Sequence, residues 1–261
     1  MKMLNIACGN RYDANWVNID FSAASAGVIQ HNILSGLPFE NDTFDAIYSG
    51  HFLEHLTPEQ ADFFLKECYE KLKPGGIIRI VVPDLENICR EYIRECDSDP
   101  YGVKREWLVI EMIDQIARNT SSGVMGKIYK DKTISREYKS YIKDRVGEDL
   151  DALRTGAAEK KMTVNKIRIK ILYYWLKLVR FMIPVSIRNN VFNSASIGEN
   201  HKWMYDQYSL HTLLARRGFR EISRMTFADS GIPDFRNYLL DENGDGSPYK
   251  GSSSLYMEAN K

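Results

Sequence analysis

Short apolar runs alternate with turn residues or with helical periodicity through the first 84 residues, and this alternation constrains the fold more than any other feature. Five runs predict strands over residues 4–8, 16–20, 28–31, 44–49 and 77–82. A helical pattern over residues 58–72, with Thr57 as its N-cap, lies between the last two, and a second helix is predicted over 85–96. Such alternation is typical of a parallel sheet with crossover helices, so we expect an α/β core.

The rest of the chain divides into a long helical segment and a late return of strand signals. Residues 97–198 carry helical patterns with Gly and Ser breaks but no alternation. An amphipathic helix over 207–217, closed by Gly218, precedes predicted strands at 219–227 and 253–259. We therefore expect a core made of residues 1–96 and 199–261, and a helical insertion over 97–198 that forms an acceptor pocket or an interface.

Charge and cysteine usage exclude several classes of protein. Lys and Arg number 35 and Asp and Glu also 35, so the chain has no net charge to attract a polyanion, and nucleic acid is not a favoured partner. The cysteines lack paired CxxC spacing, so neither a zinc site nor a disulfide framework is indicated. The first residues run into an apolar strand without a signal-peptide pattern. These features predict a reduced, cytoplasmic protein.

Three features follow early strands at the edge where open parallel sheets bind ligands. Small residues at 7–9 let backbone amides approach a ligand directly after the first strand. Asp20 closes the second strand and can accept hydrogen bonds from two ribose hydroxyls. Asn32 and Ile33 follow the third strand, where an amide and an apolar side chain can hold an adenine. A full GxGxxG phosphate cradle is absent, which favours a neutral nucleoside cofactor over NAD.

Five ordered blocks resemble the class I S-adenosylmethionine-dependent methyltransferases: LNIACGN, WVNID, LPFENDTFDAIYSGHFLEHL, LKPGGIIRIVVPD and HKWMYD. Within that superfamily they resemble predicted methyltransferases of surface-polysaccharide biosynthesis clusters. The resemblance covers roughly residues 3–93 and 200–260. It implies a Rossmann-like methyltransferase sheet, with parallel strands and an antiparallel last strand, carrying a helical insertion. It also implies S-adenosylmethionine as cofactor and S-adenosylhomocysteine as product.

The resemblance assigns cofactor contacts from the first strand to the fourth. The methionine part is expected at the first glycine motif, the ribose after the second strand, the adenine after the third and the sulfonium after the fourth. In chain order the residues are Ala7, Cys8, Gly9, Asp20, Phe21, Asn32, Ile33, Ser49, Gly50 and His51. Two positions depart from the family pattern, since Asn5 replaces the usual acid and Ala7 the first glycine. Residues 9–15 are too few for a helical crossover, so the first helix is predicted to be lost. Arg11 or Tyr12 could then cover the cofactor.

Methyl transfer to an alcohol needs a general base, and His51 and His201 are the two candidates. His201 is either the base or a residue that docks the insertion, and His51 either moves the proton or shapes the pocket. Asp84 either faces the acceptor or caps the following helix, with capping favoured. The string from His51 to His55 formally matches an inverted zinc-protease helix, which we do not favour. The superfamily leaves a divalent ion held by His51, Glu54 and His55 as an alternative to helix packing, but our prediction carries no metal.

Residues 163–187 predict a helix with a narrow basic stripe on an otherwise apolar surface. We expect one of three roles for this helix. It packs within the insertion, which we favour, or it contacts an anionic membrane surface, or it forms a homodimer interface. By resemblance we predict O-methylation of a sugar hydroxyl, on a nucleotide sugar or a lipid-linked saccharide, in capsule or O-antigen type glycan synthesis. The alternatives are a metal-assisted methyltransferase acting on a small molecule or an RNA end, and a non-catalytic cofactor-binding subunit.

Overall fold

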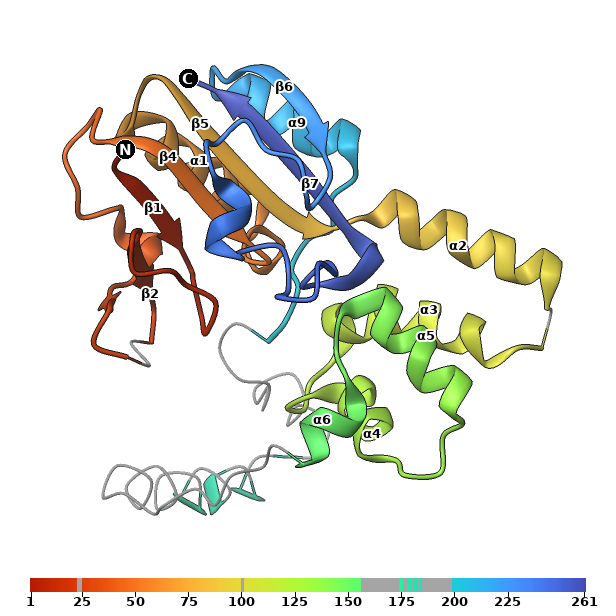
Figure 1. The fold of residues 1–261 in the computed structure, drawn as a ribbon. Helices are drawn as coiled ribbons and strands as arrows, with labels where there is room; N and C mark the ends of the chain where they lie inside the picture. The colour runs from red at the N-terminus through yellow and green to blue at the C-terminus, as the bar shows by residue number, and fades with distance from the viewer. Residues whose placement is uncertain are drawn as a thin grey trace.

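A computed structural model describes residues 1–22, 25–99, 101–155, 174–175, 178–179, 181–182, 184 and 199–261. Within these residues one sheet has the strand order β3-β2-β1-β4-β5-β7-β6 (Figure 1). The strands are β1 (Met3–Ile6), β2 (Val17–Asp20), β3 (Val28–Gln30), β4 (Phe44–Gly50), β5 (Leu72–Pro83), β6 (Arg220–Met225) and β7 (Ser254–Asn260). Every pair of neighbours is parallel except the two pairs that β7 makes. The predicted sheet with an antiparallel last strand is confirmed.

The fifth strand starts earlier than the sequence predicts. Residues 73–76, a Lys-Pro-Gly-Gly stretch between the helix predicted to residue 72 and the strand predicted from residue 77, already belong to β5. Leu72 pairs with Phe44, and the register then shifts before Ala46 pairs with Ile77. The proline and glycines are accommodated in this irregularity, where they need not donate regular ladder bonds.

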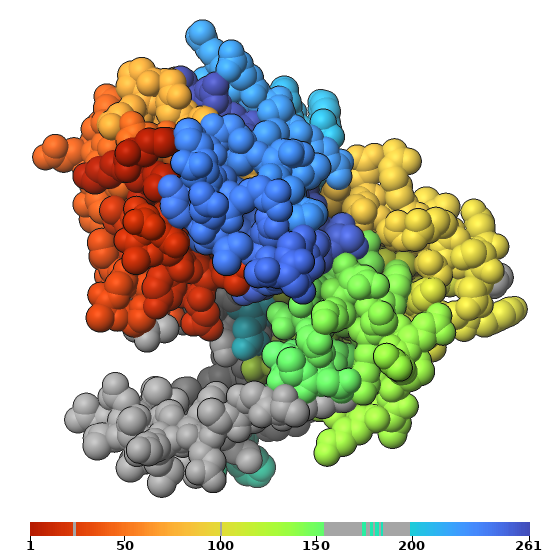
Figure 2. All heavy atoms as spheres, in the orientation of Figure 1, coloured from red at the N-terminus to blue at the C-terminus, as the bar shows by residue number. Residues whose placement is uncertain are grey.

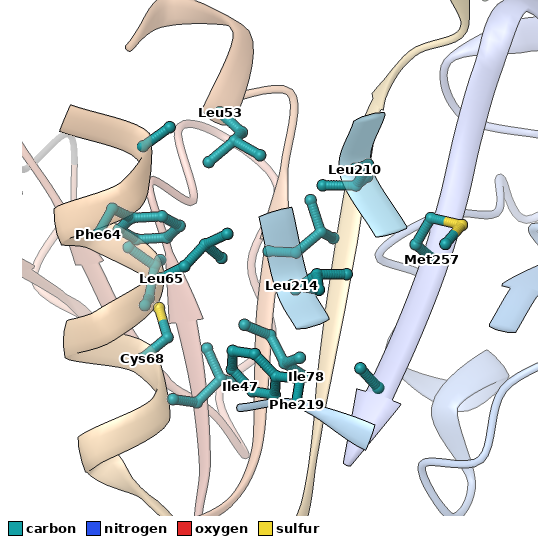
Figure 3. Packing of buried hydrophobic residues seen from close by; sticks show 14 of the residues in the cluster. Ile47, Leu53, Phe64, Leu65, Cys68, Ile78, Leu210, Leu214, Phe219 and Met257 are labelled. Atoms are coloured by element: carbon teal, nitrogen blue, oxygen red, sulfur yellow. The ribbon is translucent and has the colours of Figure 1, made fainter. Parts of the chain in front are cut away.

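Two helices cover one face of the sheet. They are α1 (Pro58–Lys71), which begins with a capping box between Thr57 and Gln60, and α9 (Gln207–Arg216). Figure 3 shows α1 side chains such as Phe64 and Leu65 and α9 side chains such as Leu210 meeting apolar residues of the central strands. The burial of these side chains, predicted from the helical periodicity, drives the packing of this layer.

The opposite face of the sheet is covered by the long connection between β6 and β7. Residues 7–16 form no helix between β1 and β2, so the predicted loss of the first helix is confirmed. Trp16, Phe235 and Leu240 pack there against Tyr48 and Tyr256 of the strands. Figure 2 shows the blue C-terminal residues lying beside the red N-terminal ones on this side of the molecule. The segment 226–253 thus occupies the layer that a crossover helix would otherwise fill.

A buried ion network fixes this segment to the sheet. Arg79 of β5 is fully buried and donates hydrogen bonds to Asp241 and Glu258, each at 2.7 Å. Tyr48 donates to the same Asp241 at 2.6 Å, and the guanidinium lies 4.7 Å from the Phe235 ring centroid. A buried charge needs such paired partners, so this network determines where the connection lies.

The described part of the predicted insertion is helical. It follows α2 (Leu85–Ser98) and comprises α3 (Val103–Ala117), α4 (Gly123–Lys130), α5 (Arg136–Val146) and α6 (Leu150–Thr155) (Figure 1). Arg145 of α5 joins these helices, because it bonds both carboxylate oxygens of buried Glu111 and the side chain of Asn87. The predicted basic helix at 163–187 lies for the most part outside the described residues. In the described part no helix is long and apolar enough to cross a membrane.

Candidate active site

Two cavities lie at the carboxyl edge of the parallel strands. The first, here the cofactor cavity, measures about 210 Å³ and is formed by Asn5, residues 7–11, the end of β4, and Leu240, Tyr249 and Lys250. The second, here the acceptor cavity, measures about 500 Å³ and lies between the strand ends and helices α3, α4 and α5. His51 and Lys250 line both cavities. The two cavities therefore meet at these two side chains.

The loop after β1 has the shape that a close ligand approach requires. Ala7 and Gly9 both have positive φ, at 56° and 52°. A Cβ on Gly9 would meet nothing within 4 Å, so backbone conformation, and not lack of space, favours glycine there. The Gly9 amide donates to Asp20 Oδ2 at 2.9 Å, which brings the first two predicted cofactor motifs together.

Asn5 explains how so short a loop is held. It stands where the family has an acid, and its amide nitrogen donates to Asn18 Oδ1 and to the Arg11 carbonyl, each at 3.1 Å. The side chain thereby ties β1 to β2 and fixes the loop that replaces the first helix. Asn5 also lines the cofactor cavity, and its Oδ1 is buried without a hydrogen-bond partner among the described residues.

Arg11 lies in the loop that Asn5 fixes. Its guanidinium stacks 4.2 Å from the Tyr249 ring centroid and donates to the Glu242 carbonyl oxygen. Its Nε is buried and has no hydrogen-bond partner among the described residues. The hydroxyl oxygen of Ser49, at the end of β4, is also buried without one. Of these two, only Arg11 lines the cofactor cavity, and its unsatisfied Nε together with the open space over Gly9 fits a polar nucleoside such as S-adenosylmethionine.

The other predicted cofactor residues surround this cavity less tightly. Asp20 also accepts from the Ser22 amide at 2.8 Å. Asn32 caps a short 3-10 helix, η1 (Ile33–Ser35), by accepting from the Leu34 amide, and Ile33 is buried in the core. Phe21 is 55% exposed. Cys8 and Gly50 line the cofactor cavity. The other predicted contacts do not line it and remain predictions, namely Asp20, Phe21, Asn32, Ile33 and Ser49.

His51 is held in a strained conformation between the cavities. Its φ is +52°, an uncommon value for a residue with a side chain, and its amide donates to the Val81 carbonyl at 2.8 Å. Nδ1 lies 3.3 Å from Glu54 Oε1, and Nε2 lies 3.0 Å from Ser254 Oγ. A carboxylate on one ring nitrogen orients the imidazole so that the other can exchange a proton.

Glu54 is ionised although it is buried. Burial by itself would raise the pKa of Glu54, but the contact of its carboxylate with the His51 ring, 3.3 Å away, and the nearby imidazoles lower it to about 2. It lies in η2 (Leu53–His55), a single 3-10 turn that does not include His51. The zinc-protease reading needs both histidines on one helix, so the structure excludes it.

His201 lies next to His51 and Glu54, and it joins the segment before α9 to helix α3. Its amide donates to the Gln115 carbonyl of α3 at 2.9 Å, and its Nε2 lies 2.8 Å from the Gln115 side-chain nitrogen. Burial lowers the pKa of His201 to about 4, so the ring is neutral near pH 7. His55 contacts its ring at a centroid distance of 4.8 Å. These contacts match the docking alternative, and His201 also lines the acceptor cavity.

Asp84 is a capping residue, as the sequence favours. Its carboxylate accepts from the Asn87 amide at 3.1 Å at the start of α2, and it pairs with Arg224 at 2.8 Å. It is buried and does not line the acceptor cavity.

The acceptor cavity has a polar wall that sequence reasoning did not identify. This wall carries charged residues of both signs, a glutamine and a tyrosine, namely Glu111, Gln115, Arg118, Tyr129, Lys130, Glu148 and Glu199. Tyr249 and Lys250 of the β6–β7 connection were also missed, because residues 241–248 look like an ordinary polar loop and no local pattern connects them to the first strand.

Comparisons with known proteins agree with this geometry. Residues 4–80, less than a third of the chain, match the model of a methyltransferase domain. No curated protein matches. The domain match supports the expected enzyme class, a methyltransferase, and the sheet order agrees with the expected fold.

Similar solved structures include methyltransferases from three prokaryotes. An S-adenosylmethionine-dependent methyltransferase from Archaeoglobus fulgidus is 13% identical with a TM-score of 0.40, covering 100% of this chain and 86% of that one. One from Thermotoga maritima, described as a possible histamine N-methyltransferase, is 14% identical with a TM-score of 0.40 and coverage of 100% and 82%. One from Mesorhizobium loti is 13% identical with a TM-score of 0.37 and coverage of 100% and 90%. At these scores the fold assignment depends on the sheet order.

Proposed function

We propose that this methyltransferase transfers the methyl group to a sugar hydroxyl, on a nucleotide sugar or a lipid-linked saccharide, in surface-glycan synthesis. The observation that carries the proposal is that the cofactor cavity and the acceptor cavity meet at His51. The polar wall of the acceptor cavity supports a hydroxyl-rich acceptor, because hydrogen-bonding groups of both kinds surround it. The choice of a glycan comes from the sequence resemblance.

The residues at the junction provide the acid–base chemistry. Bound S-adenosylmethionine supplies an electrophilic methyl group and leaves as S-adenosylhomocysteine. Nε2 of His51 exchanges its contact with Ser254 Oγ, 3.0 Å away, for the acceptor hydroxyl and accepts its proton. Glu54, 3.3 Å from Nδ1, stabilises the imidazolium that forms. The rigid turn at His51 and the walls of the acceptor cavity orient the acceptor oxygen, which a displacement reaction requires. Asp20 and Arg11 hold the cofactor, at its ribose and its carboxylate respectively.

The test is transfer of labelled methyl into an extract of the source cells, separated into nucleotide-sugar and lipid fractions. His51→Gln should lower kcat by about 10²–10⁴-fold, the usual contribution of a general base, with little change in cofactor affinity. Asp20→Ala should weaken cofactor binding by roughly 10–100-fold, because it removes charge-assisted hydrogen bonds. Asp13→Ala is the matched control, since Asp13 accepts a backbone bond from Asn15 but, unlike Asp20, does not bond the Gly9 amide.

Each outcome decides part of the proposal. Label in the nucleotide-sugar fraction identifies a nucleotide-sugar acceptor, and label in the lipid fraction a lipid-linked one. Cofactor binding without label in either fraction would contradict the glycan proposal. Full activity of His51→Gln would remove His51 from the proton transfer.

A further inference from the structure

A buried carboxylate without hydrogen bonds stands at the floor of the acceptor cavity. Glu54 is 1% exposed, and neither of its carboxylate oxygens has a hydrogen-bond partner among the described residues. The His51 ring, 3.3 Å from Oε1, contacts one of them in an ion pair. Burying a carboxylate with so few polar contacts costs free energy. A bound cation would satisfy the two oxygens that have no hydrogen bond.

Two imidazoles face the same point. One ligand atom each of Glu54, His55 and His201 lies within 4.8 Å of the others. Nδ1 of His55 is hydrogen-bonded to the Asn200 carbonyl oxygen at 3.0 Å, so it carries the proton and Nε2 keeps its lone pair. Nε2 of His201 lies 2.8 Å from the Gln115 side-chain amide. With this amide turned so that its oxygen accepts from Nε2–H, Nδ1 of His201 keeps its lone pair for a metal. Partners of this kind orient the histidines of metal sites.

The backbone holds the three residues together. The Glu54 carbonyl oxygen accepts from the amides of Lys202, at 2.7 Å, and Trp203, at 3.2 Å. The turn after β4 is thereby joined to the strand-like segment that carries His201. The arrangement is fixed by bonds that do not involve the candidate ligand atoms themselves, as a preformed site requires.

We propose that Glu54, His55 and His201 bind a divalent cation in the acceptor cavity. One carboxylate and two imidazoles suit zinc and the first-row transition ions better than magnesium, which prefers an all-oxygen set. Three protein ligands leave coordination positions open, and the acceptor hydroxyl takes one of them. The cation then lowers the hydroxyl's pKa and fixes its direction, while His51 receives the proton. This last step rests on the proposed function; the metal site itself does not.

The first test measures binding directly, on the full chain without a histidine tag. Chelator-treated protein is titrated with Co²⁺, followed by its visible ligand-field absorption, and with Zn²⁺ by calorimetry. We expect binding of about one equivalent and a ligand-field spectrum typical of mixed nitrogen and oxygen ligands. Glu54→Gln and His201→Ala should abolish the spectrum. His211→Ala, at an exposed position of α9, is the matched control and should leave it unchanged.

A variant at a residue that is not a ligand keeps the test decisive if the ligand variants fail to fold. Gln115→Ala removes only the orienting contact on His201 and should weaken Co²⁺ binding by about 10–100-fold without loss of the fold, checked by circular dichroism. The proposal fails if the wild-type protein binds no Co²⁺ or Zn²⁺. It also fails if folded Glu54→Gln and His201→Ala bind as the wild type does.

Activity separates this proposal from the proposed function. Metal binding without methyl transfer to any glycan would retain the site and reject the glycan acceptor. Glycan methylation at an undiminished rate in protein shown to be metal-free would retain the proposed function and reject the role of the cation in activating the hydroxyl.

Discussion

Replacing Arg79 with methionine should destabilise this protein much more than loss of an ordinary ion pair. The guanidinium is fully buried and bonds Asp241, Glu258 and the carbonyl oxygens of Thr226 and Asp229 at 2.7–2.9 Å. Methionine keeps much of the volume but leaves two buried carboxylates without their cation. Breaking a buried pair in this way costs about 3–5 kcal/mol, or roughly 6–20 °C in Tm for a domain of 150–250 residues.

The loss of stability should shrink as the pH falls. Burial raises the pKa of Asp241 above its ordinary value even in the presence of Arg79, and removing the cation raises it further. A carboxyl with a higher pKa in the folded state than in the unfolded state favours folding when it takes up a proton. Recovery of the variant should therefore begin at the raised folded-state pKa and be complete near the unfolded value of about 3.9.

Urea unfolding at pH 7 and pH 5, followed by tryptophan fluorescence, measures both effects. Arg90→Met is the matched control, because Arg90 is 76% exposed in its pair with Glu86 and should cost less than about 1 kcal/mol. The reasoning is refuted if the two variants lose similar free energies of unfolding at pH 7, or if the loss in Arg79→Met does not depend on pH.

Two further substitutions test the packing of the β6–β7 connection. Trp16→Ala removes a buried ring that lies edge-on to Tyr48 and Phe235, and it should cost about 3–5 kcal/mol in urea unfolding; a loss under 1 kcal/mol would mean that the connection does not need this ring. Gly147→Ala places a Cβ 2.2 Å from the Tyr249 carbonyl oxygen at a φ of +76°. It should lower stability by about 1–3 kcal/mol and weaken cofactor binding in calorimetry. Unchanged binding would mean that the end of α5 does not influence the shape of the cofactor cavity.

The sheet could be predicted because its signals are local. Each early strand is a short apolar run, and the Thr57 cap, the Asp84 cap and the Gly218 stop act within one turn of the residues that reveal them. The loss of the first helix was also predictable, since the few residues between the first two strands cannot form a helical crossover. The early start of β5 was not, because Leu72 joins the sheet through a register shift that depends on its partner strand.

The site was only half predictable, for a different physical reason. Ala7, Gly9 and Gly50 line the cofactor cavity as expected because they follow strands that share one edge. Lys250 could not be found from a pattern, because the buried Arg79 network positions it from more than 150 residues away. His201 was recognised as a candidate, but its proximity to Glu54 depends on backbone bonds between distant segments.

The shared wall of the two cavities has a consequence for inhibitor chemistry. If S-adenosylmethionine is the cofactor, a single molecule that joins an adenosine to a polar acceptor fragment through a short linker, with an amine in place of the sulfonium, should reach both cavities past the residues that they share, His51 and Lys250. Once one half is bound, the other is presented at a high effective concentration, so the linked compound should bind far more tightly than either fragment. The linker length that gives the tightest binding would then report the distance between the methyl donor and the acceptor atom.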